Sequence, residues 1–218
     1  MKAPEEFLRR AVARSINEIL RGFRDEAPTL HSLLLELLEG RRPSGADPDY
    51  FLDSDRFPFL HLPFWVVGDF EDVGSEAPFL ADTVRSSVAG YYCIRLVDDL
   101  MDESDRFRLA LLPVAQALQL GFVAPYRRHF PGDHPFWAFL DGTWIAAAES
   151  TARDHRMEEI GENEFRAVSA RKVAAARIPT FAACSFAGME HGAPEWLAFV
   201  DALGVFEQFM DDFFDWHR

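Results

Sequence analysis

The sequence is poor in cysteine and lacks any long apolar run. Its 218 residues include two cysteines, Cys93 and Cys184, each in an apolar stretch. That setting favours buried thiols over a disulfide and indicates a reducing, cytoplasmic location. The apolar runs fall well short of the roughly 20 residues that a membrane-spanning helix needs. Residues 1–6 show no apolar signal region, so we expect neither membrane insertion nor secretion.

Basic residues are also scarce. The chain has 22 Lys and Arg residues against 36 Asp and Glu residues, which gives a formal net charge of -14 at pH 7. A surface with this excess of negative charge repels nucleic acids and anionic membranes, so we expect neither as a partner. An anionic substrate would need a metal ion to offset the same repulsion.

Apolar residues recur at helical spacing along most of the chain, and strand-like alternation is absent. The composition is 49% hydrophobic with 21 Phe, which suits one substantial apolar core. We expect Asp82 to cap one helix and Pro179 to bend or break another. The predicted fold is all-α, as a single domain over residues 1–218. The predicted helices cover residues 4–24, 29–38, 81–101, 103–123, 134–157, 162–177, 180–189 and 195–216.

Three aspartates lie at the end of the helix predicted over residues 81–101. Because a helix advances about 100° per residue, Asp98 and Asp102 share one face, with Asp99 beside them. At ~5 Å and an effective dielectric constant of ~20, each repelling pair costs about 3 kcal/mol. Apart from Arg95, the preceding turns are uncharged, and carboxylates on a mostly buried helix need a cationic partner. Grouped carboxylate oxygens suit Mg²⁺, and Arg95 can neutralise the pair or contact a diphosphate.

The same spacing returns near the end of the sequence, at Asp211, Asp212 and Asp215. Aromatic residues surround this second group, so it also lies in an apolar segment. The second group therefore predicts a second set of carboxylate ligands for Mg²⁺. Two solvated acidic helix faces in an acidic protein are the alternative.

The two motifs resemble those of class I isoprenoid synthases, the trans-prenyl diphosphate synthases in particular. The second motif matches beyond its aspartates, because Gly204, Gln208, Asp211, Asp212 and Asp215 reproduce that family's Gly-x-x-x-Gln-x-x-Asp-Asp-x-x-Asp. The first motif and its surroundings, Tyr91 to Glu103, are also similar to squalene and phytoene synthases. The segment 169–174 resembles the helix whose lysine, here Lys172, binds the substrate diphosphate.

The resemblance implies a helical bundle with a central apolar cavity, across which the two motifs face each other and hold a Mg²⁺ cluster. The cluster would draw the diphosphate off an allylic prenyl substrate as pyrophosphate. Isopentenyl diphosphate would be the second substrate, and a homodimer is expected. The implied catalytic residues and metal ligands are Asp98, Asp99, Asp102, Asp211, Asp212 and Asp215. The implied substrate-binding residues are Tyr91, Arg95, Arg106, Lys172 and Gln208.

Some features of that family are missing. The Gly-Gly-Lys-Arg-x-Arg-Pro segment that binds the homoallylic substrate is absent, and residues 39–43 match it poorly. The paired arginines after the first motif are replaced by Arg106 and Arg108, which Phe107 separates. The sequence stops at Arg218, where the family usually continues with further helices.

Four functions therefore stay open. Prenyl transfer is favoured over a terpene cyclase, because cyclases usually carry an Asn-Ser-Glu type of second motif. It is also favoured over head-to-head coupling, because those synthases usually have Asn at the position of Asp211. The fourth candidate is a non-catalytic helical partner of a synthase, or a prenyl-lipid binder.

Overall fold

Helices make up most of the described chain in the computed structural model, which describes residues 2–39, 47–52, 58–67, 77–102, 109–157 and 159–215. The side chains of residues 2–4, 58, 102 and 215 lie outside that description. Within these ranges there are ten α-helices, three short 3-10 helices and no strand, which confirms the all-α prediction. None of these helices is both long and apolar enough to cross a membrane.

The chain forms two compact units, Met1–His129 and Phe130–Arg218. The elements of the first unit are α1 (Lys2–Glu26), α2 (Pro28–Glu39), α3 (Pro48–Leu52), η1 (Pro58–Leu60), α4 (Leu62–Val67), α5 (Ala77–Asp102), α7 (Leu112–Val123) and η3 (Ala124–Arg128). Those of the second unit are α8 (Pro135–Asp154), α9 (Glu162–Lys172), α10 (Ala174–Phe186), η4 (Glu190–Gly192) and α11 (Ala193–Asp215).

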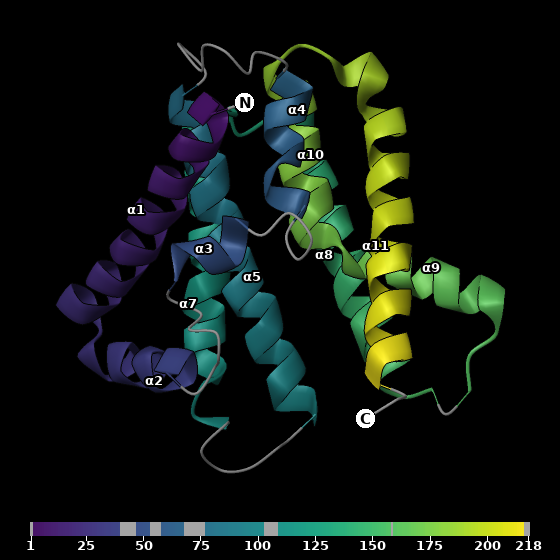
Figure 1. Cartoon of the computed structure of the whole chain (residues 1–218), viewed down its shortest axis with the longest axis horizontal. Helices are drawn as coiled ribbons and strands as arrows, with labels where there is room; N and C mark the ends of the chain where they lie inside the picture. Colours follow the sequence, from purple (N-terminus) through teal and green to yellow (C-terminus); the bar gives the residue numbers. More distant parts are fainter. Residues whose placement is uncertain are drawn as a thin grey trace. The chain divides into compact units, whose positions relative to one another are not determined.

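Helix α5 is the centre of the first unit, and it packs against both α1 and α7 (Figure 1). The buried face of α1 includes Leu8, Val12 and Ile16, which recur every four residues as an amphipathic helix requires. On the other side, the Ser86 hydroxyl donates a 2.6 Å hydrogen bond to the carbonyl oxygen of Phe122 in α7. The two helices approach closely because Gly90 of α5 has no side chain to keep the Phe122 ring away.

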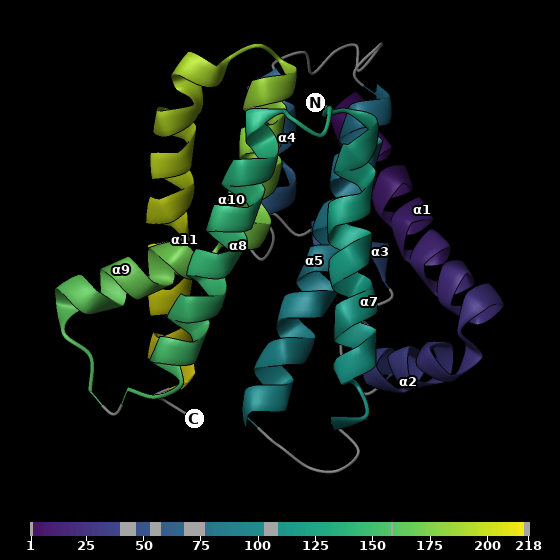
Figure 2. The same cartoon turned by 180° about the vertical axis from the view of Figure 1, so that it is seen from behind.

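In the second unit, α10 packs against α8 and α11, while α9 lies across α11 rather than along it (Figure 2). The rings of Phe139 in α8 and Phe181 in α10 stack with centroids 3.9 Å apart. Arg177 of α10 forms an ion pair with Asp201 of α11. These contacts hold α11, the helix of the second motif, against the rest of its unit.

The helix cap predicted at Asp82 and the helix break that was one of two outcomes predicted at Pro179 are both absent. Asp82 is not a helix cap, because α5 begins at Ala77 and Asp82 lies in its interior. The helix also does not break at Pro179: α10 continues through it, and the break comes earlier, at Val173. Pro179 removes a backbone hydrogen bond at a cost of roughly 3 kcal/mol. The close packing of α10, which is buried over most of its length, offsets this cost.

Two glycines in the α5–α7 contact should respond to alanine in opposite ways. A Cβ on Gly90 would lie 2.6 Å from Cδ2 of the fully buried Phe122, whereas a Cβ on Gly121 would meet Ala89 at 3.5 Å, an ordinary contact distance. Gly90→Ala should therefore lower the free energy of unfolding by about 1–3 kcal/mol. Gly121→Ala should raise it by about 0.5–1 kcal/mol, because alanine is the better helix former. Urea unfolding measures both; equal effects of the two changes would contradict the close α5–α7 packing.

Candidate functional site

The first motif lies in the last turns of α5. The side chains of Asp98 and Asp99 are 32% and 23% exposed, and each has a carboxylate oxygen 3.9 Å from a guanidinium nitrogen of Arg95. At that distance the pairs are electrostatic contacts rather than hydrogen bonds. Asp102 ends the helix, as the spacing predicts, but its side chain lies outside the described residues. Arg106 lies outside them altogether.

Tyr91 shares the face of α5 that carries Asp98 and Arg95, since positions four and seven apart align on a helix. Its hydroxyl oxygen lies 2.7 Å from that of Tyr50 in α3, and the two share a hydrogen bond. Its ring also meets the buried Phe51 edge-on, with centroids 5.3 Å apart. Helix α3 therefore covers the motif-bearing face of α5 about two turns before the aspartates.

The second motif lies at the end of α11, where Asp211 and Asp212 are both exposed. The Gln208 side chain donates a 2.8 Å hydrogen bond from Nε2 to Oδ1 of Asp212, one turn further on. Gln208 therefore orients a motif carboxylate. Asp215 is the last residue of α11, and its side chain lies outside the description.

Glu207, next to that motif, has a perturbed carboxyl group. Partial burial raises its pKa, and the negative charge of Asp211 raises it further. A carboxylate beside Asp211 thus carries an electrostatic cost that a bound cation would relieve. The end of α11 therefore brings the carboxyl groups of Glu207, Asp211 and Asp212 together on one stretch of helix.

Gly204, the first residue of the second motif, has a structural role. A Cβ at this position would lie 2.3 Å from Cγ1 of Val173, the residue at the break between α9 and α10. The glycine thus lets the end of α9, which carries Lys172, come against α11 one turn before Gln208. Lys172 itself is 24% exposed and forms a 2.7 Å ion pair with Asp154 of α8. A diphosphate would have to compete with Asp154 for this lysine.

The two motifs belong to different units, so the shared cluster stays a prediction. Among the described side chains, no three His, Cys, Asp or Glu residues lie close enough to hold a metal ion. The third aspartate of each motif falls outside that search.

Both cysteines are buried and free, as expected, and burial raises their pKa values to about 11. The two thiols therefore stay protonated at neutral pH and are poor nucleophiles and metal ligands.

Sequence reasoning missed a group of arginines in the first unit. Arg10 and Arg14 of α1, Arg85 of α5 and Arg128 of η3 line one cleft. The spacing of Arg10 and Arg14 shows that they share a helix face, but only the packing of α1 against α5 brings all four together.

No protein-family model matches the chain, and searches of curated proteins and of solved structures also find no match. The resemblance to class I isoprenoid synthases thus rests on the motif residues alone.

The contact between Gly204 and Val173 can be tested by exchanging their sizes. Gly204→Ala should lower the free energy of unfolding by about 1–3 kcal/mol, because the added methyl group overlaps Val173. Adding Val173→Ala to Gly204→Ala should recover part of that loss, since it removes the overlapping atoms. A double-mutant cycle by urea unfolding measures the coupling. Strictly additive losses would show that the two positions do not touch.

The pKa of Glu207 gives a test that depends on pH. The pKa of Glu207 is higher in the folded state than in the unfolded state. Protonated Glu207 therefore favours the native state at pH values below about 4.5, and this contribution to the free energy of unfolding is lost as pH rises through the folded pKa. Glu207→Gln should therefore stabilise the protein at pH 7 and have little effect near pH 4. In a carboxyl NMR titration, Asp211→Asn should lower the pKa of Glu207. An unchanged pKa would contradict the interaction between the two side chains.

Proposed function

We propose that this protein is a Mg²⁺-dependent class I isoprenoid synthase that ionises an allylic prenyl diphosphate, most like a trans-prenyl diphosphate synthase. One observation carries the proposal. Each Asp-Asp-x-x-Asp motif occupies the end of a long helix, α5 or α11, and neither helix has a basic residue in its last turn. The carboxyl end of a helix carries a partial negative charge and normally attracts Lys or Arg. Here the carboxylates add to that charge, so both helix ends favour binding of an external cation.

The donor set fits Mg²⁺ bound together with a diphosphate. Carboxylate oxygens are the ligands that Mg²⁺ prefers, and it is usually held by a few of them plus substrate phosphates. In this chain Asp98, Asp99, Asp211 and Asp212 would supply such oxygens, with Asp102 and Asp215 completing the motifs. When bound, the ions would stabilise the negative charge that develops on the leaving pyrophosphate.

The neighbouring side chains would have supporting roles. Gln208 holds Asp212 in place through its hydrogen bond, and this hydrogen bond reduces the reorganisation needed on metal binding. Arg95, which contacts Asp98 and Asp99 only loosely, can turn toward a bound diphosphate without breaking a short hydrogen bond. Lys172 can do so only by leaving Asp154.

One observation favours the non-catalytic alternative. Five phenylalanines of α11 have relative exposures between 44% and 57%, an unusual amount of exposed aromatic surface for one helix: Phe199, Phe206, Phe209, Phe213 and Phe214. Phe206 and Phe213 lie about 140–160° around the helix from Asp211, on the opposite side. An exposed apolar face of this kind suits a helical partner or a prenyl lipid. Cyclisation and head-to-head coupling remain alternatives of the same fold.

The proposal predicts pyrophosphate release from geranyl or farnesyl diphosphate that requires Mg²⁺. Asp98→Asn and Asp211→Asn should each lower the rate by about 100-fold or more, because each removes a charge that holds the metal. The matched control is Asp141→Asn, which removes an exposed aspartate of α8 and should leave the rate unchanged. Loss of activity in the control as well would point to a general effect of charge.

The products distinguish the candidate functions. Release that needs isopentenyl diphosphate indicates prenyl transfer. Release from one allylic diphosphate alone, with a cyclic hydrocarbon or alcohol, indicates a cyclase, and a dimeric product indicates head-to-head coupling. No release by the wild-type protein in Mg²⁺ would reject the proposal and favour the non-catalytic alternative.

A further inference from the structure

A cleft of about 540 Å³ opens between α1 and the amino-terminal half of α5. That volume is in the range of small-molecule sites in proteins. Four arginines line it, Arg10, Arg14, Arg85 and Arg128, against two carboxylates, Glu18 and Asp82. In a chain with a net charge of -14, this is a local excess of positive charge. All of the lining residues belong to the first unit.

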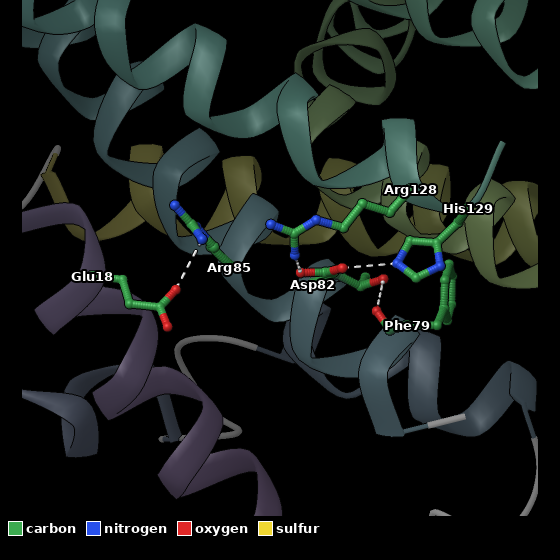
Figure 3. Close-up of polar contacts among 7 residues, drawn as sticks. Glu18, Phe79, Asp82, Arg85, Arg128 and His129 are labelled. Atoms are coloured by element: carbon green, nitrogen blue, oxygen red, sulfur yellow. Dashed lines mark hydrogen bonds and ion pairs between the residues drawn. The ribbon is translucent and has the colours of Figure 1, made fainter. Parts of the chain in front are cut away.

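Both carboxylates of the cleft are already neutralised. A guanidinium nitrogen of Arg85 lies 2.9 Å from a carboxylate oxygen of Glu18, and one of Arg128 lies 2.8 Å from Oδ1 of Asp82 (Figure 3). The other oxygen of Asp82 lies 2.9 Å from Nε2 of His129, which is itself mostly buried. These pairs fix Arg85 and Arg128 at the cleft without leaving a negative charge to repel an anion.

Arg10 and Arg14 supply the unbalanced charge. Both are exposed, and neither side chain makes an ion pair or hydrogen bond within the described residues. Because they are four residues apart on α1, their charges lie on one face and repel each other. An anion bound between them would remove that repulsion and form charge-assisted hydrogen bonds with both guanidinium groups.

Apart from Ser15, whose hydroxyl donates a hydrogen bond to the carbonyl oxygen of Ala11, the remainder of the lining is apolar, from Phe7, Ala11, Pro78 and Ala81. This cleft is separate from the first aspartate motif, because Arg85 and Asp98 are thirteen residues apart on α5, or about 20 Å. We propose that the cleft binds a small organic phosphate, with its phosphate on Arg10 and Arg14 and its apolar part against α5, and that it does so without a metal ion. This proposal is independent of the synthase activity.

Isothermal titration with inorganic pyrophosphate, in EDTA and at low salt, tests the site. EDTA removes any metal that could hold pyrophosphate at the aspartate motifs. The double change Arg10→Gln with Arg14→Gln should weaken binding by about tenfold or more, because it removes two charge-assisted contacts. The matched control, Arg21→Gln with Arg24→Gln, removes two exposed arginines of the same helix outside the cleft and should change binding less than about twofold.

The proposal is overturned if the wild-type protein does not bind pyrophosphate, or if the test and control variants weaken binding equally. Binding to phosphatidylglycerol vesicles in place of pyrophosphate would assign the arginines to a membrane surface. Asp98→Asn should leave this metal-free binding unchanged, so the cleft and the proposed synthase site can fail separately. Loss of metal-free binding in that variant would place the pyrophosphate at the motif and also reject the cleft.

Discussion

Carboxylates at the carboxyl end of a helix are the constraint on which the functional account depends. Such a helix end already has a partial negative charge, and each added aspartate raises the cost of forming it. In α5, Arg95 offsets part of that cost from 3.9 Å. In α11, Gln208 orients Asp212 but adds no charge, and partial burial together with the negative charge of Asp211 raises the pKa of Glu207. A divalent cation would stabilise both helix ends.

The contacts that position these helix ends are close-packed and depend on glycine. Gly90 lets α5 approach Phe122 of α7, and Gly204 lets α11 approach Val173 at the end of α9. The glycine at position 204 of the second motif is therefore explained by helix packing rather than by a chemical role. The same contact brings the end of α9, which carries Lys172, against α11, which carries the second motif. Packing thus links two of the segments in which the resemblance was found.

The sequence predicts most of the long helices, because their apolar periodicity is local. It does not predict the short α3, and α7 begins at Leu112, within the helix predicted over residues 103–123. The predicted cap at Asp82 and the predicted break at Pro179 are absent because both positions depend on distant contacts. Asp82 bonds Arg128 and His129, more than 40 residues away, and packing keeps the helix continuous at Pro179. The arginine cleft could not be predicted for the same reason, because Arg10 and Arg85 meet only after α1 packs on α5. The residues of both motifs were predicted to lie on helices, and they do, whereas the cluster between them stays a prediction.

The proposed metal site, shared by the two motifs, is tested most directly by electron paramagnetic resonance of Mn²⁺, used in place of Mg²⁺, in the presence of pyrophosphate. The account predicts that the wild-type protein binds Mn²⁺ and that Asp98→Asn and Asp211→Asn each weaken this binding, although the two residues belong to different units. Mn²⁺ binding that is unchanged by either substitution would contradict a cluster held by both motifs.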